Sequence, residues 1–131
     1  MSTTLTIRDE STGGGTLHEF ALEVLTERLT VRELIRSRVY QEVQDYNRKQ
    51  PEVFRGLIEP TDAERTLNGF KLKTRRQIDW KNQFEKALEA FASSRVLVLV
   101  DEKQVDDLDQ EITVGPGAVV SFLKLTPLVG G

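Results

Sequence analysis

Hydrophobic residues alternate with polar ones near the start of the chain, which is the pattern of β-strands. Leu5 and Ile7 mark a first strand. A second strand is marked by Leu17, Phe20, Leu22 and Val24. The glycines at 13–15 allow the backbone conformations of a connecting loop, and they precede a strand rather than the helix that a phosphate-binding loop would need. The pattern predicts a β-hairpin over residues 4–24.

The hydrophobic period then lengthens to that of an α-helix. One apolar stripe is formed by Val31, Leu34, Ile35, Val39, Val43 and Tyr46. Thr30 and Glu33 have the spacing of a capping box, in which each side chain bonds the other residue's backbone N–H. The helix should therefore begin near Val31 and end before Pro51, because proline cannot continue it.

Residues 50–93 are predicted to form an insertion that contains a second helix. Pro51 and Pro60 interrupt any regular pattern, although Asn68-Gly69 could form a small hairpin turn. The helical spacing returns over residues 78–94, with one face formed by Trp80, Phe84, Leu88 and Phe91. We expect this aromatic face to pack on the core; a surface for a partner or a cofactor is the alternative.

Two strands are expected in the last third of the chain. Residues 95–100 read Arg-Val-Leu-Val-Leu-Val, a continuous apolar run typical of a buried strand. After a turn at 101–103, Val105 brings the chain back to the sheet. The Gly115-Pro116-Gly117 turn then leads to a last strand within residues 118–125. A hairpin, a helix, an insertion and further strands predict an α+β domain with helices packed on one sheet.

Composition narrows the functional classes. The 131 residues are enough for one domain with its own core, and the net charge of −3 argues against a protein that coats nucleic acid. The absence of cysteine excludes disulfides and thiolate chemistry, and suits a reducing, cytoplasmic setting. No apolar run is long enough to span a membrane, and no signal peptide is recognised. We therefore expect a cytoplasmic protein that binds neither nucleic acid nor membrane.

No candidate active site emerges. His18 is the only histidine, and we expect it on the surface. The acidic stretch from Asp107 cannot be a calcium loop, because Ile112 and Ala118 stand where that loop needs glycine and glutamate. The basic residues Lys71, Lys73, Arg75 and Arg76 could hold phosphates, but a solvated edge is favoured because no aromatic platform accompanies them. We expect no catalytic residue, no metal and no bound cofactor, and thus a carrier, modifier or binding module rather than an enzyme.

The sequence ends with Leu-Thr-Pro-Leu-Val-Gly-Gly, which has the pattern of neither a helix nor a strand. Residues 126–131 are expected to form a flexible tail, reaching roughly 20 Å past the sheet if fully extended. Pro127 ends strand pairing, and Leu128 and Val129 offer apolar anchors. Gly130 and Gly131 lack Cβ atoms and can pass a narrow channel. The carboxylate of Gly131 can be activated as an acyl-adenylate for attack by a thiol, an amine or sulfide.

These features together resemble the ubiquitin-like β-grasp family. The hairpin feeding a helix resembles the family's opening. Lys103, Gln104, Val105, Asp106 and Asp107 are similar to a Gly-Lys-Gln-Leu-Glu-Asp run of ubiquitin, and the terminal diglycine matches the family's activated tail. The resemblance implies a β-grasp domain over residues 1–125. The segment 47–94 is much longer than ubiquitin's own connection, and the tail looks more like that of the sulfur-carrier small subunit of molybdopterin synthase.

The resemblance implies a protein modifier of the bacterial ubiquitin-like type. An E1-like activating enzyme would use ATP to adenylate Gly131, and the chain would pass by thioester, through an E2-like conjugating enzyme, to a target protein. A JAB-type peptidase would accompany them, and Lys103, Gln104, Asp106 and Asp107 are candidates for partner docking. The alternatives are a sulfur carrier with a C-terminal thiocarboxylate, and a non-conjugated β-grasp interaction domain.

Overall fold

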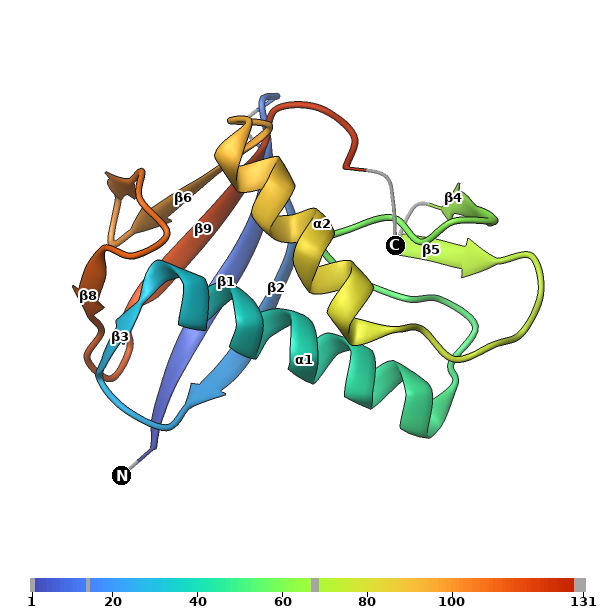
Figure 1. The fold of residues 1–131 in the computed structure, drawn as a ribbon, viewed down its shortest axis with the longest axis horizontal. Coiled ribbons are helices and arrows are strands. Elements are labelled where there is room, and N and C mark those ends of the chain that lie inside the picture. Colours follow the sequence, from blue (N-terminus) through green and yellow to red (C-terminus); the bar gives the residue numbers. More distant parts are fainter. Residues whose placement is uncertain (1, 14, 67–68, 129–131) are drawn as a thin grey trace.

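The computed structural model describes residues 2–13, 15–66 and 69–128, which form an α+β fold (Figure 1). A mixed five-stranded sheet carries two helices on one face. The helices are α1 (Val31–Lys49) and α2 (Trp80–Ala92). The strands are β1 (Thr3–Ser11), β2 (Thr16–Val24), β3 (Arg28–Thr30), β4 (Ala63–Thr66), β5 (Gly69–Leu72), β6 (Val96–Val100), β7 (Lys103–Val105), β8 (Glu111–Thr113) and β9 (Val119–Lys124).

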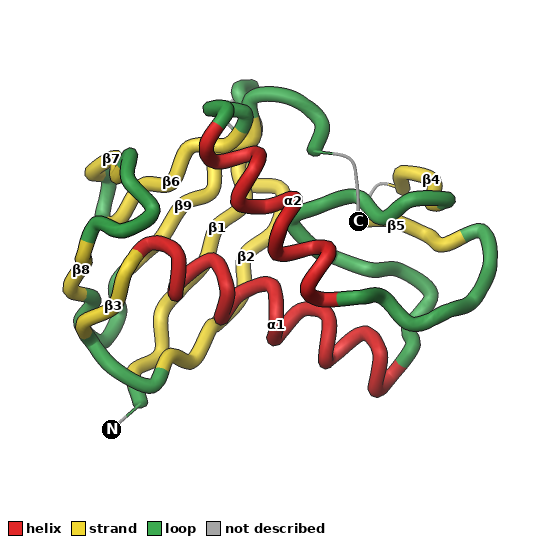
Figure 2. Tube along the Cα trace, viewed as in Figure 1, coloured by secondary structure: helices red, strands yellow, loops and turns green. Residues whose placement is uncertain are grey.

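The main sheet has the strand order β2-β1-β9-β6-β7 (Figure 2). The predicted hairpin of β1 and β2 is confirmed, with Ile7 opposite Phe20 and a register shift after Asp9. On its other side β1 pairs in parallel with β9, which places Ile7 opposite Val120. The first and last strands therefore lie side by side in the interior of the sheet. Two short ladders, β3 with β8 and β4 with β5, lie outside it.

Helix α1 begins and ends where its sequence predicts. The Thr30 hydroxyl accepts a hydrogen bond from the Glu33 N–H at 3.1 Å, and the Glu33 carboxylate accepts one from the Thr30 N–H at 2.9 Å, so the capping box is confirmed. At the other end Gln50 adopts a left-handed conformation immediately before Pro51. These two signals fix the helix across the inner face of the sheet.

Helix α2 is confirmed, and its aromatic face packs on the core as expected, although only Phe91 of that face is fully buried. Its fully buried residues are Gln83, Ala87, Ala90 and Phe91. Trp80, Phe84 and Leu88 are only partly buried beside the core. The helix is rotated because small alanines allow it to approach its neighbours closely, and this leaves the aromatic stripe at the margin. Trp80 there meets Tyr40 edge to face, with ring centroids 5.1 Å apart.

The segment between α1 and α2 is more regular than its sequence suggests. Phe54 exchanges backbone hydrogen bonds with Phe70, and β4 pairs with β5; the Leu67-Asn68 part of the expected turn lies outside the described residues. Gly56 packs so closely that a Cβ there would overlap the Phe54 ring and lie 2.8 Å from a Glu42 oxygen. The segment is thus built into the core through its backbone.

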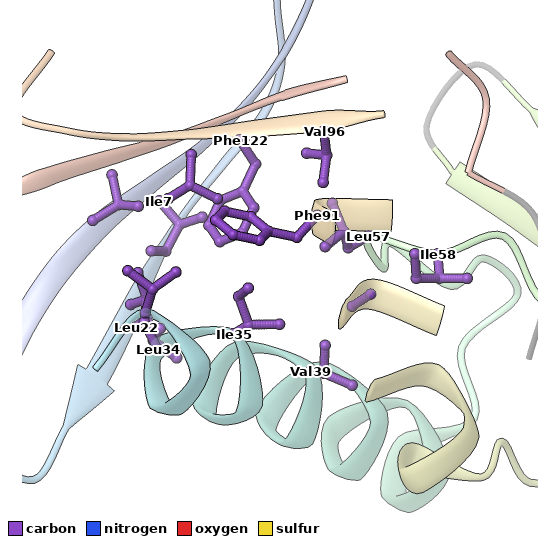
Figure 3. Packing of buried hydrophobic residues seen from close by; sticks show 14 of the residues in the cluster. Ile7, Leu22, Leu34, Ile35, Val39, Leu57, Ile58, Phe91, Val96 and Phe122 are labelled. Atoms are coloured by element: carbon purple, nitrogen blue, oxygen red, sulfur yellow. The ribbon is translucent and has the colours of Figure 1, made fainter. Parts of the chain in front are cut away.

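The core lies between the sheet and the helices (Figure 3). Ile7 and Phe122 of the sheet face Ile35 and Val39 of α1, while Leu57 comes from the inserted segment. All five side chains are almost completely buried. The inserted segment therefore contributes to the same core as the helices and the sheet.

Two strands are confirmed, but not every apolar residue that marks them is buried. Leu17 is 61% exposed, because His18 and Phe20 take the inward positions of β2. In β6, Val96 and Val98 are buried, whereas Leu97 is half-buried on the face that carries no helix. Within the part of the chain that the structure describes, no helix is long and apolar enough to cross a membrane.

Candidate functional site

The C-terminal segment was the main candidate site in the sequence. Val129, Gly130 and Gly131 lie outside the described residues. The preceding residues do not continue from β9 in an extended line. Pro127 is exposed, whereas Leu128 is only 4% exposed, and its carbonyl accepts a hydrogen bond of 2.7 Å from the Glu59 N–H. The chain thus turns back after β9 and meets the inserted segment.

A shallow groove of about 290 Å³ accompanies this turn. Its walls come from the ends of β1, β2 and β9, the inserted segment and the tail itself. Leu57 and Phe70 form apolar parts of the wall, and Arg65 lies at the groove with its guanidinium bonded to Glu59 at 2.6 Å. A partner that contacts the described part of the tail would therefore also contact the inserted segment.

The candidate docking residues lie together on a different part of the surface. Lys103 and Gln104 belong to β7, which is the edge strand opposite β2, and Asp106 and Asp107 follow it; all four are exposed. The Asp107 carboxylate accepts a hydrogen bond from the Asp109 N–H at 2.9 Å, which orders the acidic loop. In Figure 2, β7 lies at the left, whereas the described chain beyond β9 runs over the top of the molecule, away from β7. The structure therefore does not bring the strip and the tail together.

The basic residues from Lys71 to Arg76 lie on β5, in the hairpin of β4 and β5, and in the loop that follows it. Lys71 forms an ion pair with Glu52 at 3.5 Å, and Arg76 donates to the Thr61 carbonyl at 2.7 Å. Lys73 and Arg75 are exposed. The run is spread over a strand and a loop rather than presented on one ordered face.

A buried charge cluster, which the sequence analysis missed, lies beneath the end of the sheet. Arg38 of α1 is completely buried and donates from Nη2 to the Asp9 Oδ2 atom at 2.6 Å, with a parallel bond from Nη1 to Oδ1. Its Nε donates to Glu42, whose other oxygen accepts the Leu57 N–H at 2.9 Å. The guanidinium also lies 4.5 Å from the centroid of the Phe122 ring. One side chain thus connects β1, α1 and, through Glu42, the inserted segment.

Burial and pairing set the protonation of this cluster. Burial alone would raise the pKa of Asp9, but the charge and hydrogen bonds of Arg38 lower it below the ordinary value. For Glu42, burial raises the pKa and the charge of Asp9 adds to the shift, while the charge and hydrogen bond of Arg38 oppose it. Burial would lower the pKa of Arg38, yet the two carboxylates raise it, so the guanidinium stays charged. The cluster therefore holds a buried, charged guanidinium between two carboxylates.

Two further groups border the cluster on the inner face of the sheet. His18, expected at the surface, is half-buried: it lies opposite Asp9 in the ladder and stacks on Phe20 with ring centroids 4.9 Å apart. Burial lowers the pKa of His18, although the charge of Asp9 opposes the shift. Lys124 of β9 is also half-buried, and burial lowers its pKa. Both groups face the side on which β2 meets the inserted segment.

The chemistry of this cluster is structural rather than catalytic. Asp9 and Glu42 are occupied by Arg38, so neither is available as a general base without breaking a buried ion pair. Among the described ranges no group of three or more potential metal ligands comes together. A signal for the cluster does exist in the sequence: Asp9 continues the inward alternation of Leu5 and Ile7, and Arg38 falls on the apolar stripe of the helix.

Comparison with known proteins assigns no family: no protein-family model, no curated protein and no solved structure gives a significant match to this chain. The proposals below therefore depend on the geometry and on the sequence features themselves.

Proposed function

We propose that this chain is a ubiquitin-like β-grasp protein that modifies other proteins through the carboxylate of Gly131. An activating enzyme adenylates that carboxylate, and the chain passes through thioesters to an amine of a target protein. The chain supplies no catalytic residue of its own. Its part is to present the tail and the surfaces that the activating and conjugating enzymes recognise.

The observation that carries this proposal is the place of β9. This strand lies in the interior of the sheet, parallel to β1, and Leu125 directly after it bonds the Arg95 carbonyl at 2.9 Å. A hairpin, a helix across one face and a last strand inserted beside the first are the features that a β-grasp needs. The C-terminal segment is consequently attached to a rigid strand and not to a mobile edge.

The activation step is ordinary acyl chemistry. A carboxylate oxygen of Gly131 attacks the α-phosphate of ATP and pyrophosphate leaves, which gives an acyl-adenylate. A thiolate of the enzyme then attacks the acyl carbon and AMP leaves. ATP is the activating enzyme's substrate, so the proposal requires no cofactor on this chain.

The inserted segment and the β7 strip supply separate surfaces for the partners. The strip of Lys103, Gln104, Asp106 and Asp107 carries mixed charge on exposed residues, which suits electrostatic docking. The inserted segment contacts the tail at Leu128. An activating enzyme that takes the tail must therefore approach the inserted segment, whereas a second partner could use the strip at the same time.

The test is recovery of an N-terminally tagged copy with its native end, from its own host under denaturing conditions, followed by mass spectrometry. Adducts joined through Gly131 would support the modifier and identify the acceptor. A species in which one oxygen is exchanged for sulfur would instead support the sulfur carrier, the alternative that the Pro127 tail favours. An unmodified chain alone would support the non-conjugated interaction domain.

A matched pair of variants separates conjugation from folding. Deletion of Gly131 should abolish every adduct without changing the free energy of unfolding, because a terminal glycine packs no side chain. Lys81→Met, which removes one exposed charge of α2 outside the tail and the β7 strip, should leave the adducts unchanged. Adducts that survive the deletion would exclude the proposed chemistry.

A further inference from the structure

A small cavity opens beside the buried charge cluster, between the ends of β1, β2 and β9 and the inserted segment. Its volume is about 210 Å³. Its lining includes the polar residues Lys124, Arg55 and His18 and the apolar residues Leu17 and Phe70. Asp9 and Arg65 also line it. The cavity shares part of its wall with the groove along the tail, but the activation of Gly131 proposed above requires no ligand in it.

Lys124 is a partly buried cation on the wall of this cavity. It continues the inward positions of Val120 and Phe122 in β9, so its side chain faces the core side of the sheet. No ion pair or hydrogen bond joins its Nζ to any of the described residues. Asp9 is the anion that acts on it most strongly, but both Asp9 oxygens already accept bonds from Arg38. A partly desolvated ammonium with no partner is costly unless something pairs with it.

The surrounding charges make the cavity electropositive. Arg55 is exposed at its wall and has no ion pair among the residues that the structure describes. Arg65 is bonded to Glu59, whereas Asp9 and Glu42 share the single charge of Arg38. Lys124 and Arg55 are the cations of the cavity wall that form no ion pair with a described residue, and the charges of Asp9 and Glu42 act on Lys124 without contacting it. Half-buried His18 adds a ring nitrogen that can donate or accept a hydrogen bond.

The remaining wall is apolar. Leu17, exposed over 61% of its surface, and Phe70 of β5 stand on the cavity's wall. The volume is below the roughly 300 Å³ at which pockets for drug-sized ligands begin, so a complete ligand must be small. A small body with one anionic end would satisfy both the cations and the apolar wall.

We propose that this cavity binds a small oxyanion, a carboxylate or a phosphate, with the charge held by Lys124 and Arg55 and any apolar part resting on Leu17 and Phe70. Charge-assisted hydrogen bonds from both cations give the anion its orientation. The ligand gives Lys124 the direct ion pair that none of the described residues supplies. Binding is independent of Gly131 and of any activating enzyme.

The experiment is an NMR titration of the full chain, at constant ionic strength, with inorganic phosphate in one arm and 3-methylbutanoate in the other. We expect saturable shifts of the backbone amides of Leu17, His18, Phe70 and Lys124 by about 10 mM ligand. Saturation with phosphate alone assigns a phosphate ligand, and saturation with 3-methylbutanoate alone assigns an aliphatic carboxylate; either supports the site. The pKa of the Lys124 ammonium should rise on binding.

Variants decide whether the cations hold the anion. Lys124→Met keeps a long side chain without its charge, and Arg55→Gln changes an exposed residue that the fold does not need. Each should weaken binding about tenfold or more, whereas the control Lys103→Met on β7 should not change it. The Arg55→Gln result stands even if Lys124→Met fails to fold. Absence of saturation in both arms, or equal affinity in Arg55→Gln and the unchanged chain, would overturn the proposal.

Discussion

Arg38 holds both carboxylate oxygens of Asp9, a residue 29 positions earlier in the chain, with a distance of 2.6 Å between Nη2 and Oδ2. Neither side chain is exposed by more than 3%. The pair joins the middle of α1 to the end of β1 within the mainly apolar layer between the sheet and the helices. It fixes the position of the helix along the strand, because a shift by one residue would separate two buried charges.

Removal of Arg38 should be strongly destabilising. Arg38→Met leaves Asp9 and Glu42 buried without a counter-charge, and breaking such a pair costs about 3–5 kcal/mol. The free energy of unfolding, measured with chemical denaturant, checks the value. Arg8→Met is the matched control, because Arg8 forms a surface pair with Glu19 worth about 0–1 kcal/mol. Equal losses in the two variants would show that the buried pair is not a structural requirement.

The stability of the protein should fall as the pH is lowered through the ordinary pKa of histidine. Burial lowers the pKa of His18 from 6.5; Asp9 opposes the shift, while Arg38, Arg55 and Lys124 add to it. The folded chain therefore binds the proton less readily than the unfolded chain, so this contribution is complete above pH 6.5 and is lost as the pH falls toward the folded pKa.

His18→Gln is the variant that checks this pH dependence. Since the sequence contains one histidine, an NMR titration of its ring reports the pKa directly. Unfolding measured at several pH values should show that His18→Gln removes the slope just below pH 6.5. The raised pKa of Glu42 acts with the opposite sign, lowering stability as the pH rises above 4.5. A ring pKa at or above 6.5 would contradict the prediction.

Gly56 should not accept a side chain. Gly56→Ala places a methyl group against the Phe54 ring and 2.8 Å from a Glu42 oxygen, which forces the inserted segment away from α1. We expect a loss of about 1–3 kcal/mol. Gly115→Ala is the control, since a Cβ there meets nothing within 4 Å. Thermal unfolding of the two variants would show whether the insertion is as tightly packed as the structure indicates.

Leu128 should contribute to stability although it lies beyond the last strand. Leu128→Ala removes a side chain that is 4% exposed, and we expect a loss of about 2 kcal/mol. Leu125→Ala, at a residue 39% exposed, should lose less. If both variants unfold alike, the tail is not held against the inserted segment in solution.

The secondary structure could largely be predicted because its signals are local. The capping box at Thr30 and the stop before Pro51 give α1, and the alternation around Leu5 and Ile7 gives β1. The rotation of α2 could not be predicted in this way. The spacing of the aromatic residues indicated one face of the helix, whereas the most deeply buried face includes the small residues Ala87 and Ala90.

The candidate sites could be predicted less well from the sequence. Asp9 and Arg38 each occupy an inward position, yet their pairing depends on how α1 lies across β1, which no local pattern contains. Lys124 looks like an ordinary strand lysine until β2 and the inserted segment close around it. Gly131 was chosen from its chemistry alone, and its role stays a prediction.

The parallel pairing of β1 with β9 has a consequence for how the chain acquires its structure during synthesis. Thr6 pairs with Val119, so all the residues between them are synthesised before the two segments can meet. Until Lys124 has emerged, the hairpin of β1 and β2 and the strand β6 expose unpaired inner edges with no strand between them. Such contacts between distant segments slow folding, and exposed edges favour aggregation. The nascent chain therefore depends on its last strand to join two incomplete halves, and ribosomes stalled before residue 119 would release a product that cannot close its sheet.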